Sequence, residues 1–191
     1  MSTHLCVRSS YSLLNGTMSV SNLVNQAKML GFSALALVEK DVMYSTIAFE
    51  RQCKKQGIRP IYGLEIELSD FQGMSLILLA KDTAGYHELI QVSSLVSTHT
   101  LTLDLAQLSE LISTCFILIP SVNGPFDGLD LNEVQQRAIE IRQILQQPYY
   151  LGLTYHETAF FKTRNQSLKK ALGASGIESF FKLCLLSKEG G

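Results

Sequence analysis

The chain has 191 residues, of which 46% are hydrophobic and 17% are charged, and its formal net charge is −1. These values are typical of a single globular domain with a substantial core, and they exclude a disordered chain. The near-neutral charge gives no indication of a strongly basic, nucleic-acid-binding surface. No run approaches the roughly 20 apolar residues of a membrane span, so we expect one cytoplasmic domain over residues 1–191.

Apolar runs alternate with helical patterns along the chain, which is typical of an α/β protein with a largely parallel sheet. The predicted strands cover residues 3–8, 34–38, 59–67, 74–80, 115–120 and 149–154. The predicted helices cover residues 20–30, 43–56, 82–96, 104–112, 132–147 and 164–174. Turn residues mark loops at 69–73 and 121–130, and Asp130 or Asn132 is expected to cap the fifth helix.

The last part of the chain departs from this alternation. A buried strand is due after residue 177, but residues 178–186 have the pattern of an amphipathic helix. We therefore expect that a segment carrying this strand belongs between residues 177 and 178 and is missing from this sequence. The four cysteines are scattered and form no C-x-x-C pair, as expected of reduced thiols; they are Cys6, Cys53, Cys115 and Cys184.

The most informative motif lies at residues 4–16 (HLCVRSSYSLLNG), where a predicted strand ends in a loop. Three further motifs follow in order, at 34–44 (ALALVEKDVMY), 57–66 (GIRPIYGLEI) and 76–89 (LILLAKDTAGYHEL). Together they resemble the PHP (polymerase and histidinol phosphatase) domain, in the version found at the N-terminus of the bacterial DNA polymerase III alpha subunit. The resemblance covers residues 1 to about 96 and is diffuse beyond.

The resemblance implies a distorted (β/α)7, TIM-like barrel whose cleft lies at the carboxyl ends of the strands. It also implies the N-terminal domain of a DNA-directed DNA polymerase, a nucleotidyltransferase of DNA replication. Mg²⁺ is expected for the polymerase part of such a parent chain, and no cofactor for this domain. The expected partners are the remainder of the polymerase chain, other replisome subunits and, through the parent chain, DNA, with no membrane.

Most of the metal ligands that the resemblance implies are replaced here. Cys6 and Arg8 occupy the two positions of the family's His-x-His pair, and Asn15 occupies a position where the family usually has Asp. Glu39 and Lys40 take the places of the Asp and His in Thr-Asp-His, and Glu65 alone matches a family ligand. Since guanidinium and ammonium groups cannot donate a lone pair to a metal, we expect a vestigial, metal-free cleft without catalytic residues.

The replacement of two metal ligands by cations predicts an ion-pair network in addition to loss of the metal. Arg8 and Lys40 would supply positive charge to carboxylates that a metal no longer neutralises. We expect the Arg8 guanidinium within hydrogen-bonding reach of Glu65 or Glu39, with Lys40 nearby. Glu67 is assigned to the strand face opposite Glu65, which excludes the two as a catalytic pair.

Simpler interpretations remain open. Without the resemblance, Glu39 and Lys40 would be an ordinary solvated pair in a loop, and Arg8 an ordinary strand-end arginine. The histidines cannot be aligned to family ligands; those concerned are His87, His99 and His156.

Two other functions also remain open. One is a metal-dependent phosphoesterase or 3′–5′ proofreading exonuclease of the same family. The other is a sugar-phosphate- or polyol-binding barrel, which would account for the α/β alternation but for none of the four motifs.

Overall fold

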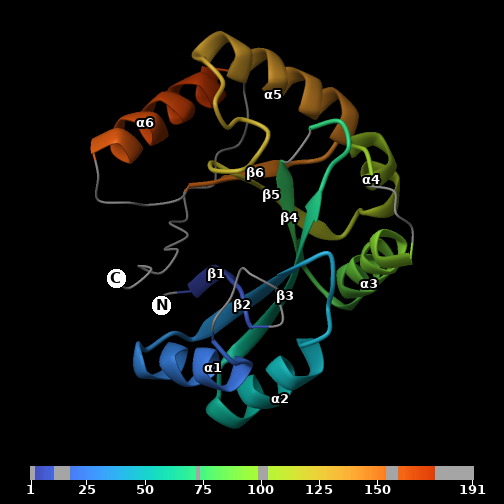
Figure 1. Ribbon diagram of the computed structural model, residues 1–191, viewed down its shortest axis with the longest axis vertical. Helices are drawn as coiled ribbons and strands as arrows, with labels where there is room; N and C mark the ends of the chain where they lie inside the picture. Colours follow the sequence, from blue (N-terminus) through green and yellow to red (C-terminus); the bar gives the residue numbers. More distant parts are fainter. Residues whose placement is uncertain (1–2, 11–17, 72–73, 99–102, 154–158, 175–191) are drawn as a thin grey trace.

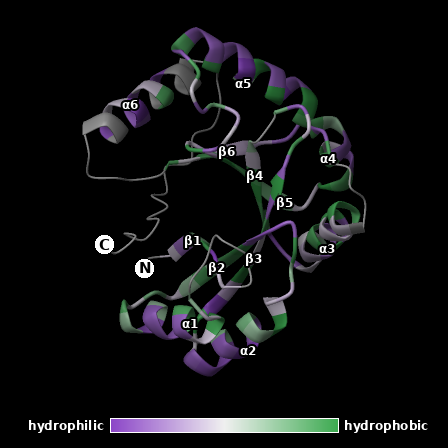
Figure 2. Cartoon of the chain, in the orientation of Figure 1, coloured by the Kyte–Doolittle hydropathy of each residue, from purple (hydrophilic) through white to green (hydrophobic). Residues whose placement is uncertain are grey.

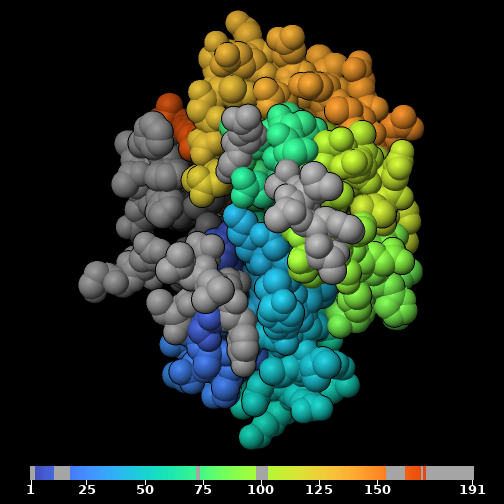
Figure 3. Space-filling model, turned by 45° about the vertical axis from the view of Figure 1, so that its right-hand side comes forward, coloured from blue at the N-terminus to red at the C-terminus, as the bar shows by residue number. Residues whose placement is uncertain are grey.

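The computed structural model describes residues 3–10, 18–71, 74–98, 103–153 and 159–174, which form one curved sheet with helices on its outer side (Figure 1). In the space-filling view the molecule is elongated, with α5 at one end and the pair α1 and α2 at the other (Figure 3). The described residues thus form a layered α/β fold.

The sheet has six strands in the order β1-β2-β3-β4-β5-β6. Pairing is parallel from β1 to β3 and between β5 and β6, whereas β4 runs antiparallel to both of its neighbours. The strands are β1 (Thr3–Val7), β2 (Ala34–Lys40), β3 (Arg59–Glu67), β4 (Ser75–Ala80), β5 (Cys115–Pro120) and β6 (Tyr149–Gly152).

In the described part of the chain, six helices connect the strands or follow the last one, and several of their ends have recognisable signals. They are α1 (Val20–Met29), α2 (Thr46–Gln56), α3 (Thr83–Thr98), α4 (Leu105–Leu111), α5 (Leu131–Leu145) and α6 (Ala159–Ala174). Asp104 and Asp130 each form a capping box, with Gln107 and Glu133 respectively. Gly57 ends α2 in the left-handed conformation, at φ 68°.

The two faces of the sheet are buried differently. On the outer face, strand side chains pack against the helices in two apolar clusters, one under α1 and α2 and one under α3 to α6. On the inner, concave face a smaller cluster is built from strand residues alone; its buried members are Cys6, Ala36, Val38, Ile77, Leu79 and Leu118. Figure 2 shows the resulting contrast between largely hydrophobic strands and helices that carry hydrophilic residues on their outer sides.

All six predicted strands and all six predicted helices are present, and Asp130 caps α5 as expected. The predicted largely parallel sheet needs one correction, because β4 is antiparallel. Only seven residues, 68–74, separate β3 from β4, which is too few for the crossover helix that a parallel connection requires. The helix predicted at 164–174 begins earlier, at Ala159.

The α/β fold with a half-barrel sheet is consistent with the expected TIM-like barrel. In the described part of the chain, the six strands leave β1 and β6 as edges, and they lie on the same side of the molecule in Figure 1. The suspected missing segment after residue 177 and the helix predicted at 178–186 lie outside the described residues.

Gly63 provides a test of packing on the inner face. A Cβ atom at this position would lie 2.7 Å from Leu79 Cδ2, 2.8 Å from Val38 Cγ2 and 3.0 Å from the Leu78 carbonyl oxygen. We expect Gly63→Ala to lower the free energy of unfolding by about 1–3 kcal/mol through overpacking, as measured by urea denaturation. Gly152→Ala is the matched control, since its nearest atom would be at 3.6 Å, and equal losses in both variants would contradict this packing.

Candidate functional site: an ion-paired cluster on the inner face

Charged side chains gather on the inner face of the sheet at the carboxyl ends of β2 and β3 and just beyond the end of β1. We call this group the inner-face cluster; its members are Arg8, Lys40, Glu65, Glu67 and Ser75. β2 and β3 align in parallel so that Lys40 lies beside Glu65. Ser75 belongs to this end of the sheet because β4 runs the other way and begins opposite Glu67.

Arg8 and Glu65 form the central ion pair of the cluster. Arg8 Nε donates to Glu65 Oε2 at 2.9 Å and Nη2 donates to the same oxygen, while Ser75 Oγ donates to Oε1 at 2.8 Å. The Glu65 side chain is 9% exposed and that of Arg8 is 31% exposed. Both carboxylate oxygens of Glu65 are therefore engaged.

The pKa of Arg8 depends on two opposing effects, burial and attraction to negative charge. Burial acts to lower it, but the charges of Glu65 and Cys6 and the hydrogen bond to Glu65 outweigh burial, so the pKa is raised. Arg8 thus stays protonated, and its positive charge at Glu65 is permanent.

Lys40 forms the second ion pair. Its Nζ lies 3.0 Å from Glu67 Oε2, and both side chains are 38% exposed. This hydrogen bond is the main reason that the pKa of Lys40 is raised, and the charge of Glu65 adds to it. Two fixed cations therefore face two carboxylates on neighbouring positions of one sheet face.

Asp41 follows directly after Lys40 and has an unusual backbone. Its φ is +61°, and its N–H donates to the Glu65 carbonyl at 2.8 Å. Its Oδ1 is buried without a hydrogen-bond partner among the described residues. Burial raises the pKa of Asp41, Lys40 opposes this rise, and Glu67 and Glu65 add to it.

Glu39 lies apart from these ion pairs, because successive strand residues point to opposite faces. Its buried Oε1 accepts from Ser9 Oγ and from Ser45 Oγ, each at 2.6 Å, and Oε2 accepts from the Ser45 backbone N–H at 3.3 Å. Ser9 follows β1 and Ser45 precedes α2. Glu39 therefore connects the two loops beside the cluster.

The structure brings together three of the six residues predicted for the cleft. Arg8 pairs with Glu65 and Lys40 lies beside it, which confirms the predicted ion pair. Cys6 lies near Arg8 and is buried in the inner apolar cluster. Glu39 instead bonds to hydroxyl groups on the outer side, and Asn15 lies outside the described residues.

The assignment of Glu65 and Glu67 to opposite strand faces was wrong. Strand side chains alternate with a period of two, so residues two apart share a face, and both carboxylates bond to cations of the inner-face cluster. The same period could have identified Glu67 from the sequence. Ser9, Ser45 and Ser75 carried no comparable signal, since serines of this kind are common at loops and strand ends.

The described residues of this cleft do not fit a multinuclear metal centre. No group of three or more His, Cys, Asp or Glu side chains in the described ranges is arranged to hold a metal ion. Glu65, the one matching carboxylate, accepts from Arg8 and Ser75 instead. The arrangement can fix charges in place and hold strand ends together.

A comparison with protein families matches residues 4–156 to the PHP domain. The chain belongs to the PHP domain family. The match covers all six strands except the first residue of β1, and it includes the whole inner-face cluster. The inner-face cluster is thus a feature of a PHP domain.

Curated relatives of this PHP domain carry the name DNA polymerase III subunit alpha. That of Bacillus subtilis (strain 168) is 42% identical over 99 residues, which cover 50% of this chain and 9% of that protein. That of Halalkalibacterium halodurans is 36% identical over 97 residues, again covering 50% and 9%. That of Streptococcus pyogenes serotype M3 (strain MGAS315) is 28% identical over 122 residues, covering 63% and 12%. The chain therefore spans about a tenth of the length of these relatives.

Solved structures share the fold of this PHP domain at low sequence identity. An amidohydrolase from Chromobacterium violaceum superposes with a TM-score of 0.67 at 10% identity, over 93% of this chain and 84% of that one. A two-domain protein from Bacteroides vulgatus, described as containing a predicted PHP-like metal-dependent phosphoesterase, gives 0.59 at 14% identity, over 96% and 51%. Within the described ranges, no helix has the length and apolar character needed to cross a membrane.

The Arg8–Glu65 pair predicts a non-additive response to mutation. We expect Arg8→Met to lower the free energy of unfolding by about 1–3 kcal/mol, because it leaves the Glu65 carboxylate buried without its cation. Arg8→Met combined with Glu65→Gln should cost less than Arg8→Met alone. Chemical denaturation of the unmodified protein, Arg8→Met, Glu65→Gln and the double variant measures the coupling, and additive losses would contradict a coupled pair.

The raised pKa of Asp41 predicts that its replacement by asparagine stabilises the protein in a pH-dependent way. A carboxyl group with a raised pKa favours the protonated form in the folded state, so its ionisation destabilises the fold as pH rises through that pKa. Asp41→Asn should therefore raise the melting temperature at pH 7, with a gain that disappears below the ordinary aspartate pKa of about 3.9. Asparagine also tolerates the positive φ. A gain of equal size at pH 3 and pH 7 would contradict this origin.

Proposed function

We propose that this PHP domain is a metal-free, non-catalytic scaffold within a bacterial DNA polymerase III alpha chain. The observation that carries the proposal is the Arg8–Glu65 ion pair, in which a permanent cation bonds to the one carboxylate that matches a family metal ligand. The names of the relatives support the polymerase context.

Electrostatics explains why the ion pair and a metal compete. A divalent ion at Glu65 would stand close to the Arg8 guanidinium, and like charges at short distance in a partly buried site repel strongly. The Lys40 ammonium would add to this repulsion, since Glu65 already raises its pKa through their attraction. A divalent ion would therefore have to displace Arg8 from a carboxylate that Ser75 also holds.

We infer the context of the domain from its relatives. The parent chain would be a DNA-directed DNA polymerase, a nucleotidyltransferase that uses deoxynucleoside triphosphates with Mg²⁺ held outside this domain. Its partners would be the remainder of the polymerase chain, further replisome subunits and DNA, in the cytoplasm. In this proposal the domain contributes a rigid, ion-paired surface rather than a reaction.

Metal removal tests the proposal. We expect purified protein to contain no stoichiometric Zn²⁺, Mn²⁺ or Fe²⁺ by elemental analysis, and EDTA to leave its melting temperature unchanged. A domain built around a metal would lose stability on chelation, because metal binding contributes to folding.

Phosphoesterase and exonuclease assays test the same proposal from the opposite direction. Hydrolysis of p-nitrophenyl phosphate or of a 3′ DNA end that depends on added Mn²⁺ and is abolished by Glu65→Gln would contradict the proposal. Such activity would establish a metal-dependent phosphoesterase or 3′–5′ exonuclease instead. Lys55→Gln, an exposed change on α2, is the control for unspecific effects of a substitution.

A further inference from the structure

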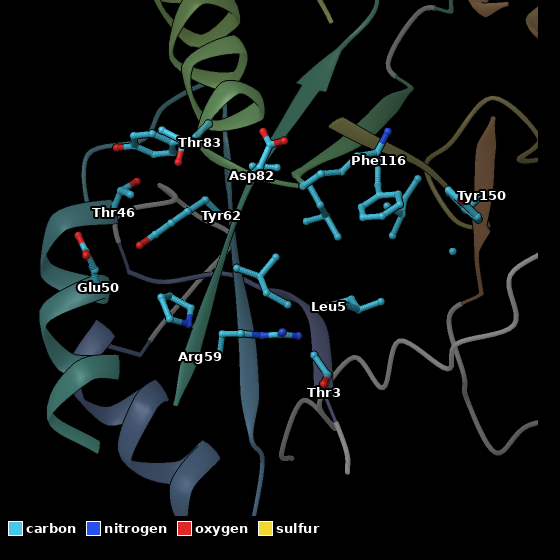
Figure 4. A pocket seen from close by; sticks show the side chains of 18 of the residues that line it. Thr3, Leu5, Thr46, Glu50, Arg59, Tyr62, Asp82, Thr83, Phe116 and Tyr150 are labelled. Atoms are coloured by element: carbon cyan, nitrogen blue, oxygen red, sulfur yellow. The ribbon is translucent and has the colours of Figure 1, made fainter. Parts of the chain in front are cut away.

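A cavity of about 780 Å³ lies at the end of the sheet opposite to the inner-face cluster (Figure 4). β4 pairs only with Gly63–Glu67 of β3, so residues 59–62 run past the end of β4. The cavity surrounds this part of β3 and reaches β1, β5 and β6. Its volume lies within the range of about 300–1,000 Å³ that is usual for small-molecule sites.

Aromatic rings form much of the cavity wall. The Phe116 side chain is 41% exposed despite its position within the sheet, and its ring meets that of Tyr150 edge to face at 5.7 Å. Figure 4 shows Phe116, Tyr150 and Leu5 on one side of the strands and Tyr62 on the other. An exposed ring in a concave wall offers a flat apolar surface to a planar ligand.

Two cations also line the cavity. The Arg59 side chain extends across it toward Thr3 and Leu5 (Figure 4), and Lys81 Nζ lies 5.0 Å from the centre of the Phe116 ring. The ion pairs found among the described residues include neither Arg59 nor Lys81. Lys81 contacts the Phe116 ring, and neither charge is compensated by an ion pair in the described ranges.

The two acidic residues of the lining are engaged elsewhere. Glu50 pairs with Lys54 one helical turn away at 2.7 Å. Asp82 Oδ1 accepts from the Gly85 N–H at 3.0 Å at the start of α3. The cavity lining therefore has two cations, two carboxylates that are bonded to other groups, and exposed aromatic surface.

We propose that this cavity binds a phosphate ester with a planar aromatic body, of the class of the nucleoside monophosphates. The phosphate would bond to one of the two cations, Arg59 or Lys81, and the charge of the other would add to the attraction, since both suit phosphate oxygens. The base would pack against Phe116 and Tyr150. This site is independent of the scaffold role and of the inner-face cluster.

Calorimetric titration of the 191-residue chain with AMP tests the proposal. We expect submillimolar binding to the unmodified protein, with adenosine and inorganic phosphate each binding much more weakly because each lacks half of the ligand. Arg59→Met and Lys81→Met should both weaken AMP binding, by about tenfold or more for the cation that hydrogen-bonds the phosphate and less for the cation that acts through its charge alone. Lys55→Met, an exposed cation of α2 that does not line the cavity, should stay within twofold.

Nuclear magnetic resonance locates the site without any substitution. AMP should shift the amide signals of Lys81, Asp82 and Phe116 and leave those of Arg8 and Glu65 unchanged. The proposal is overturned if AMP does not bind, if both variants bind AMP normally, or if inorganic phosphate binds equally well. It is also overturned if an oligothymidylate binds far more tightly than AMP through the same two cations, because the site would then serve nucleic acid.

Discussion

The buried carboxylates of Glu39 and Glu65 impose the main constraint on this end of the sheet. They lie on neighbouring strands but on opposite faces, and the two residues as a whole are 1% and 7% exposed. A buried charge is costly unless hydrogen bonds or an opposite charge compensate it. Glu39 draws its donors from Ser9 and Ser45, and Glu65 draws its donors from Arg8 and Ser75.

Because Glu39 and Glu65 both need hydrogen-bond donors, the loops at the carboxyl ends of the first strands are held in defined positions. Ser9 and Arg8 are adjacent in sequence, so the segment that follows β1 supplies donors to both faces of the sheet. The Asp41 N–H fixes the end of β2 to the Glu65 carbonyl, and Ser93 Oγ of α3 donates to the Asp41 carbonyl at 3.0 Å. The inner-face cluster is thus held by strands, loops and a helix together, which gives a physical basis for a scaffold role.

The sequence predicted the elements well because their signals are local. Continuous apolar runs mark β2 and β4, and Asp130 and Gly57 mark helix ends. The Arg8–Glu65 pair was predictable only through the family motifs, which align positions far apart in the chain. The separation of Glu39 from Arg8 follows from strand alternation, whereas its serine partners depend on loop conformations that no local pattern specifies. The cavity was not predicted, since it depends on where β4 ends relative to β3.

The reversal of β4 also affects how the sheet can assemble. A short loop joins β3 to β4, whereas each parallel pairing must enclose a whole helix before its strands meet. The entropy lost on closing a loop grows with its length. The hairpin of β3 and β4 is therefore the pairing that costs the chain least conformational freedom. Glu65, Glu67 and Ser75 all belong to that hairpin, so the carboxylates of the inner-face cluster are contained in the most local contact of the sheet.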